Sequence, residues 1–288
     1  MAIKGLRVPL FADYNFDGNK VFYTNGFVSG KAVEYAVETE TSDDNPLYGD
    51  DVIAEHDYGI FAGGTLTLNT TDLDQYSSKR VLNLKEVKRT VGDSEVTELV
   101  YDDDAVPKSK GFGIIEVHQI NDVDQYRALV LARVTPRNPS EAATTKGESI
   151  EWQTKELECS IERTEEVSAK YNRPWKYEAW FDTQEKAMQY LKTILNVLDR
   201  LEITSVEGTA AGSTKLTISP SLSAGNAYKY STSGPEPTYM QDLTGWEDWD
   251  GSEEIQAASG STLYVAEVNT QKKAVRAGTV TVKAKAGE

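Results

Sequence analysis

The sequence predicts a mainly-β protein, in which a mostly antiparallel sheet assembly with one substantial α-helix is followed by an immunoglobulin-like β-sandwich. Three observations lead to this fold class. Short runs of alternating apolar and polar residues, separated by Gly, Asn and Asp, recur along the chain and are typical of strands. One stretch, 183–201, instead has apolar residues at helical spacing. At Glu202 the composition changes to Ser, Thr, Gly and Ala with few charges, which indicates a second domain.

The central strand of the first domain is expected at 126–134, which is nearly all apolar and contains no Gly or Pro. Both of its faces hold side chains that favour burial, so each face must be covered. One predicted face carries Tyr126, Ala128, Val130, Ala132 and Val134, and the other carries Leu129 and Leu131. A strand at 111–119 precedes it, and a tight turn at Asn121-Asp122 predicts that the two strands form an antiparallel hairpin.

The rest of the first domain is predicted to be mostly strands. These are expected at 8–11, 21–23, 31–40, 61–69, 87–91, 96–101, 150–164 and 174–181. The segment 41–55 is expected to be a polar loop ending in a short extended piece, and 70–84 to contain a short helix opened by Thr71-Asp72. In the strand expected at 150–164, the inward-facing residues are Ile150 and Trp152 and then, shifted by one position, Leu157 onward. This shift predicts a β-bulge at 154–156.

The helix at 183–201 is expected to cover one face of this sheet, because its apolar residues form a broad stripe. Asp182, followed three positions later by Glu185, has the pattern of a capping box at its N-terminus.

The predicted domains are 1–202 and 203–288. In the second, short β-type runs alternate with turn residues, as in a small immunoglobulin-like sandwich. Trp246 and Trp249 could form an aromatic surface that contacts a sugar. Packing of one tryptophan in the core and of the other at its margin is the preferred interpretation.

Composition and charge narrow the functional classes. The chain has 288 residues, 39% hydrophobic residues and a mean hydropathy of -0.49, and no apolar run approaches the roughly 20 residues of a membrane helix, so we expect a soluble protein without an export signal. The net charge is -16. Nine carboxylates lie in 34–57 and six in 93–104, and neither segment contains Lys or Arg. These segments are either solvated loops or a surface that repels polyanions or meets a basic partner.

Motifs for catalysis or metal binding are missing from the sequence. It contains no Walker loop, nucleophile elbow, zinc-protease motif or Cys/His metal spacing. The turn from Asp13 to Gly18 superficially matches a calcium loop, but Thr24 stands where that loop needs a glutamate, so we predict a hairpin turn. His118 and Cys159 lie within predicted strands and are expected to be structural. We therefore expect no enzymatic activity, no metal, no cofactor and no nucleic-acid binding.

Several segments, in their order and spacing, carry a resemblance to a known family. They are 3–9 (IKGLRVP), 47–55 (LYGDDVIAE), 63–68 (GGTLTL) with Asp72-Leu73, 111–113 (GFG), 126–128 (YRA), 175–177 (WKY), 181–183 (FDT) and the appended immunoglobulin-like module. The chain resembles the major tail tube proteins of long-tailed phages with non-contractile tails, most closely those of siphophages and prophages of Gram-positive bacteria. The segment 79–104 is longer and more charged than in that family.

The resemblance implies a tail-tube-type antiparallel β-barrel or sandwich with one flanking α-helix as the fold of the first domain. It also implies a structural virion protein that assembles in the host cytoplasm into stacked, hexameric rings. Its implied partners are further copies of itself, the tape measure protein, and the tail terminator and distal tail proteins, with no membrane involved. Phage DNA would pass through the tube without specific binding, and an acidic wall would repel its phosphates. Candidates for lining this lumen or for assembly are Asp43, Asp44, Asp50, Asp51, Glu55, Asp102, Asp103 and Asp104.

Two other functional classes stay open. The immunoglobulin-like end and its tryptophan pair would suit a surface adhesin or carbohydrate-binding module, although no signal peptide is evident. The abundant acids and aromatic residues alone would suit a glycan-processing enzyme.

Overall fold

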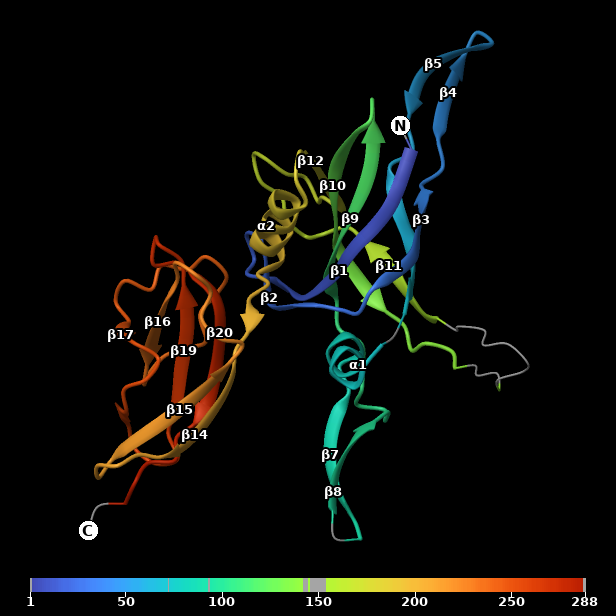
Figure 1. The fold of residues 1–288 in the computed structure, drawn as a ribbon. Coiled ribbons are helices and arrows are strands. Elements are labelled where there is room, and N and C mark those ends of the chain that lie inside the picture. The colour runs from blue at the N-terminus through green and yellow to red at the C-terminus, as the bar shows by residue number, and fades with distance from the viewer. Residues whose placement is uncertain (1, 72, 93, 142–144, 146–153, 287–288) are drawn as a thin grey trace. The chain divides into compact units, whose positions relative to one another are not determined.

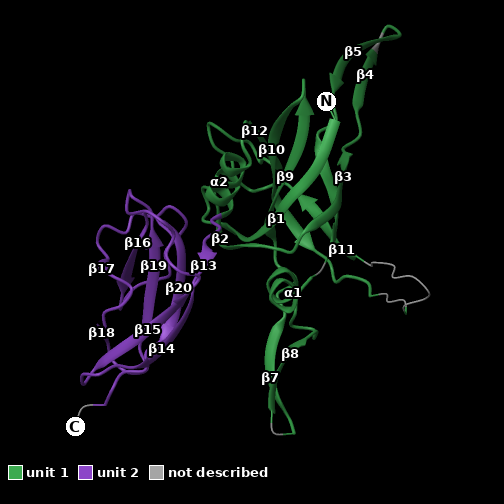
Figure 2. Cartoon of the chain, viewed as in Figure 1, with its two compact units in different colours: residues 1–195 green, residues 196–288 purple. Residues whose placement is uncertain are grey.

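A computed structural model describes residues 2–71, 73–92, 94–141, 145 and 154–286 of the chain. The protein is mainly β, with 56% strand and 7% helix, which confirms the predicted fold class in the form of an open sandwich and not a closed barrel. The chain divides into two compact units, Met1–Leu195 and Asn196–Glu288 (Figure 2). Unit 2 therefore begins before the domain boundary predicted at Glu202.

Unit 1 is built on one antiparallel sheet whose strands follow the order β2-β1-β9-β10-β11-β6-β3, with β12 also paired to β10 (Figure 1). The strands are β1 (Ala2–Phe16), β2 (Val21–Val28), β3 (Ala32–Thr41), β6 (Phe61–Thr70), β9 (Lys110–Ile120), β10 (Val123–Pro136), β11 (Lys155–Glu162) and β12 (Lys176–Phe181). As predicted, β10 is central, and it pairs with β9 through a turn in which Asn121 and Asp122 have φ of 48° and 62°. Asn and Asp tolerate this left-handed conformation better than most residues.

The main core lies on one face of the curled sheet and contains inward residues of β1, β6, β9, β10 and β11. Leu66 and Leu68 face inward as predicted. The predicted faces of the central strand are wrong at one position, because Val134 joins Leu129 and Leu131 in this core. A register shift between Leu131 and Val134 adds the residue that changes the phase.

Helix α2 (Gln184–Leu195) covers the other face, but it is shorter than predicted. It stops where Asn196 adopts φ of 49°, and Asp199–Arg200 form β13. Its cap also differs from the prediction, since the Thr183 hydroxyl accepts the Lys186 N–H at 3.3 Å.

Glycines on β9 let α2 approach the sheet closely. A Cβ at Gly111 would lie 2.7 Å from Leu195 Cδ2, and one at Gly113 would lie 2.8 Å from Leu195 Cδ1. The helix buries Ala187, Leu191 and Leu195. The Gly-Phe-Gly segment thus has a packing role.

The predicted short helix is α1 (Gln75–Leu82), which begins after Asp74 and not at Thr71-Asp72. The Asp74 carboxylate accepts the Ser77 N–H at 2.7 Å, and Val81 and Leu82 enter the core. The expected bulge at 154–156 does not appear as a register shift in β11, whose pairing with β6 is regular from Lys155 onward. Ile150 and Trp152, on which that prediction depended, lie outside the described residues.

Unit 2 is a sandwich of a five-stranded sheet, β13-β20-β19-β16-β17, and a three-stranded sheet, β14-β15-β18. The strands are β14 (Glu202–Glu207), β15 (Ser213–Ser219), β16 (Ala227–Ser231), β17 (Glu247–Trp249), β18 (Ile255–Gln256), β19 (Thr262–Val268) and β20 (Ala274–Thr281). Leu216 and Ile255 from the small sheet share a core with Leu263 and Val265 from the large one, which holds the two layers together.

Candidate functional site

The acidic segment 41–57 forms a projecting β-hairpin, β4 (Asn45–Gly49) and β5 (Val52–Asp57). The short extended piece predicted at its end lies in β5, but the part before it, predicted as a polar loop, contains β4. The correction has a local cause. Asp50 and Asp51 adopt φ of 48° and 64°, as a two-residue hairpin turn requires, and Asp is among the residues that tolerate this conformation. Asp50 and Asp51 are therefore the tip of a paired ribbon, and Glu55 lies along it.

This hairpin exposes large apolar side chains. Leu47, Tyr48, Val52 and Ile53 are 62%, 65%, 62% and 54% exposed. Tyr48 and Ile53 lie opposite each other on one face, so the adjacent Leu47 and Val52 point to the other face. An isolated two-stranded ribbon is marginal in water, and this one has apolar groups on both sides without a core of its own. The ribbon has the properties of a surface that becomes buried against another molecule.

The base of the hairpin is fixed by side-chain contacts. The Asp44 carboxylate accepts the Gly59 N–H at 2.6 Å and lies 3.6 Å from His56 Nε2. The His56 ring packs edge-on against Tyr58, with ring centroids 4.0 Å apart. A Cβ at Gly59 would lie 2.0 Å from the Ser42 carbonyl oxygen, so glycine is required there. Asp44 is therefore a structural residue of the hairpin, and Asp43 beside it is exposed.

A second hairpin, predicted from the sequence, consists of β7 (Lys85–Val91) and β8 (Ser94–Val100). Every residue of β7 is exposed, and Val87, Val91 and Val96 on one face have no described apolar cover. Its charges form exposed ion pairs: Lys88 with Glu95 at 2.8 Å and Arg89 with Glu98 at 2.8 Å. Each such pair contributes little stability, so a partner could rearrange these pairs at small cost.

The acids that follow β8 are not equivalent. Asp102 and Asp104 both bind Lys85, at 3.0 and 2.6 Å, and the hydrogen bond from Lys85 lowers the pKa of Asp102. Asp103 between them is exposed. Lys85 therefore offsets part of the charge predicted for this cluster.

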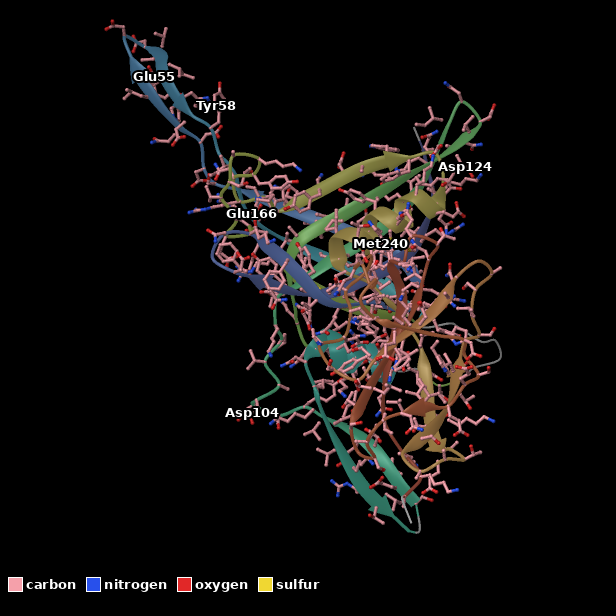
Figure 3. The ribbon with its side chains drawn as sticks, turned by 90° about the vertical axis from the view of Figure 1, so that its left-hand side faces the viewer. Glu55, Tyr58, Asp104, Asp124, Glu166 and Met240 are labelled. Carbon is pink, nitrogen blue, oxygen red and sulfur yellow. The ribbon has the colours of Figure 1, made fainter. Side chains whose placement is uncertain are left out.

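The two hairpins project from opposite ends of unit 1 (Figure 1). Figure 3 labels Glu55 on the first and Asp104, which follows β8 at the base of the second. The structure thus does not bring the candidate acids together in one cluster. What the two ends share is a ribbon with exposed apolar residues, and this feature was missed at the sequence level. The available signal was the occurrence of Leu47, Tyr48, Val52 and Ile53 within a strongly acidic segment.

The tryptophans of unit 2 do not form a shared surface. Trp249 is 8% exposed, packs against Tyr228 in the sandwich core and donates its Nε1–H to the Glu253 carbonyl at 2.8 Å. Trp246 packs against a different cluster around Leu243. The preferred prediction of packing roles fits this arrangement, and a flat sugar-binding platform does not.

A polar cluster lies inside unit 1, at residues for which no functional site was predicted from the sequence. The Glu116 side chain is 3% exposed and accepts hydrogen bonds from Tyr35, His118 and Arg127. Burial raises the pKa of Glu116, but these hydrogen bonds outweigh burial and lower the pKa below its ordinary value. Alternation with inward Phe112 and Ile114 was the signal that could have revealed this buried carboxylate.

The cysteine, the metal-binding side-chain types and the helices of the described residues bear on other functional classes. Cys159 lies in the core, and burial raises the pKa of its thiol to about 12, which keeps the thiol protonated and unreactive. Among the described residues, no group of three or more His, Cys, Asp or Glu side chains is arranged to hold a metal ion. None of the described helices is both long enough and apolar enough to cross a membrane.

Comparison of the sequence with protein-family models and with curated proteins found no match.

Proposed function

We propose that this chain is a self-assembling structural subunit, the major tail tube protein of a long, non-contractile phage tail. The carrying observation is the pair of ribbons at opposite ends of unit 1, each with exposed apolar side chains. Burial of such side chains in a second copy would stabilise an assembly by about 1.5–3 kcal/mol for each large residue.

The position of the ribbons also favours an open assembly. Contacts between different surfaces at opposite ends of a subunit are heterologous, and such contacts continue from copy to copy unless a rotation closes them. In stacked rings, contacts within a ring close by rotation, whereas contacts between rings continue along the tube. Exposed apolar surfaces mark interaction sites, and two of them at opposite ends suit a subunit with a neighbour on each side.

Further parts of the proposal rest on the family resemblance and on charge. The lumen would be acidic and would repel DNA phosphates, consistent with the net charge of -16. The other partners would be the tape measure protein and the proteins at the two ends of the tail, and the site of action would be the virion. The carbohydrate-binding alternative loses one of the two features that motivated it, the exposed tryptophan pair, because Trp249 is buried.

The test is negative-stain electron microscopy of the purified chain over a range of concentrations. We expect rings or tubes for the natural sequence and mostly monomers for the double variant Tyr48→Ser with Ile53→Ser. Because both side chains are more than half exposed, the free energy of unfolding should change little, by about 0.5 kcal/mol or less.

The matched control is Val206→Ser, which removes a 53% exposed apolar side chain from unit 2 and should leave assembly unchanged. A natural chain that stays monomeric at all concentrations would argue against the proposal. If the Tyr48/Ile53 variant assembled at the same concentration as the natural chain, this hairpin would not be part of the assembly interface.

A further inference from the structure

The curled sheet of unit 1 has a seam between its first and third strands. Strand β3 approaches β1, but within the described residues no ladder joins them: β3 pairs with β6, and β1 pairs with β2 and β9. The half of β1 from Ala2 to Arg7 pairs with β9, and its pairing with β2 starts only at Leu10. Two strand edges therefore lie along the seam without backbone hydrogen bonds between them.

Side chains close this seam. Tyr35 of β3 and Leu6 of β1 both pack against the core beneath it. The Tyr35 hydroxyl also donates a hydrogen bond to the Glu116 carboxylate of β9, which is the neighbour of β1. This bond crosses from the last strand of the sheet to its opposite half. On its other edge β3 is held by its ladder with β6. Across the seam, apolar packing is non-directional, so this hydrogen bond is the directional contact that holds β3 against β9.

Other strands hold the acceptor of this bond in place. His118 Nε2 lies 2.8 Å and Arg127 Nη1 3.0 Å from Glu116 Oε2, which leaves Oε1 for Tyr35. Arg127 also binds Glu178 of β12, and Lys176 lies 3.4 Å from Glu178. Strands β9, β10 and β12 thus present a preorganised acceptor, and β3 contributes only the Tyr35 donor.

The free end of β3 leads directly into the projecting ribbon. β3 ends at Thr41, β4 starts at Asn45, and the link is tied back by Asp44 and Ser42 to residues that precede β6. Any displacement of β3 at the seam is therefore transmitted to the β4–β5 hairpin.

We infer that Tyr35 and Glu116 form a latch that holds β3 and sets the position of the β4–β5 hairpin, and that release of the latch lets this part of the sheet open locally. The latch is a positioning device and does not depend on whether the protein assembles. Local opening is expected where few contacts hold a segment, and within the described residues only side chains hold β3 across the seam.

The test is amide hydrogen exchange of the full-length Tyr35→Phe variant. Phenylalanine keeps the ring in the core and removes only the hydroxyl, and Glu116 keeps His118 and Arg127 as donors. A hydrogen bond to a charged group corresponds to roughly ten- to hundredfold in an opening equilibrium. We expect exchange in β3, β4 and β5 to become faster by about that factor, with β9 and β10 unchanged.

The matched control is Tyr14→Phe, which removes a tyrosine hydrogen bond to the Glu165 carboxylate on the β1–β2 side of the sheet. Two results would overturn the inference. One is equal exchange of β3 in the Tyr35→Phe and Tyr14→Phe proteins. The other is an acceleration that extends equally to β9 and β10, which would show that Tyr35 stabilises the whole unit and not a latch.

Discussion

Glu116 is a charged residue at a position of β9 where strand alternation predicts a side chain that faces the core. The alternation of β9 places it beside Phe112 and Ile114, where an isolated carboxylate would be costly to bury. Three donors make the position tolerable, and they come from β3, β9 and β10. Removal of one partner from such a group costs more than the group contributes when it is complete.

The lowered pKa of Glu116 predicts a dependence of stability on pH. Because the folded pKa lies below the ordinary value of 4.5, the stabilisation is fully present above that value and is lost as pH falls through the folded pKa. Glu116→Gln should lower the free energy of unfolding by about 2 kcal/mol at neutral pH, since it weakens charge-assisted hydrogen bonds. In urea unfolding, the difference in the free energy of unfolding between the two proteins should shrink as pH falls below 4.5 and through the lowered pKa of Glu116.

The control for this prediction is Glu38→Gln, which neutralises an exposed carboxylate on β3 and should leave the midpoint unchanged at neutral pH. A constant difference between the natural protein and Glu116→Gln from pH 7 to about pH 3 would show that charge is not the cause.

At the scale of elements, strands with strong local signals could be predicted from the sequence. The β9–β10 hairpin is set by a turn that needs Asn or Asp, and β6 by the alternation of Leu66 and Leu68. The extent of α2 could not be predicted in this way. Its apolar stripe continues through Leu198 and Leu201, but those side chains enter the cores of unit 2. Helical periodicity does not reveal which of two cores a residue joins.

The β4–β5 hairpin shows a second reason for failure. Its acidic residues stand out in the sequence, but the segment buries almost none of its side chains, so no alternation of buried and exposed residues is present to indicate strands. The ladder depends on the turn at Asp50-Asp51 and on local ties at Asp44 and Gly59. The candidate acids could therefore be named from the sequence, but the β4–β5 hairpin that carries several of them could not be predicted.

At the scale of the whole molecule, the two units suggest separable roles. The chain should be cut after Asn196 and not after Leu201, because Leu198 and Leu201 pack in unit 2 while Asn196 supplies the left-handed residue that ends α2. We expect residues 1–196 to fold and still form tubes by electron microscopy. A shortened chain with normal circular dichroism but no assembly would place unit 2 in the ring contacts.

The last prediction concerns the charge of the conduit. Lysine at Asp50 or Asp51 would confuse the test, because a left-handed backbone costs about 1–2 kcal/mol for most residues. Glu55 and Asp57 are exposed and extended, so Glu55→Lys with Asp57→Lys reverses charge on the same hairpin without strain at the turn. The control is Glu207→Lys with Glu236→Lys, which makes the same change in net charge on exposed positions of unit 2.

If the hairpin borders the lumen, tubes of the Glu55/Asp57 variant should bind short duplex DNA at low salt, whereas natural and control tubes should not. Lysines that contact phosphates displace counterions, so the logarithm of the affinity should fall linearly with that of the salt concentration, by about 0.9 for each phosphate neutralised. Mobility-shift titrations of assembled tubes at several salt concentrations measure this slope. Equal DNA binding by the hairpin and control variants would mean that Glu55 and Asp57 face the outside of the tube, and the acidic hairpin would then have to be explained by assembly alone.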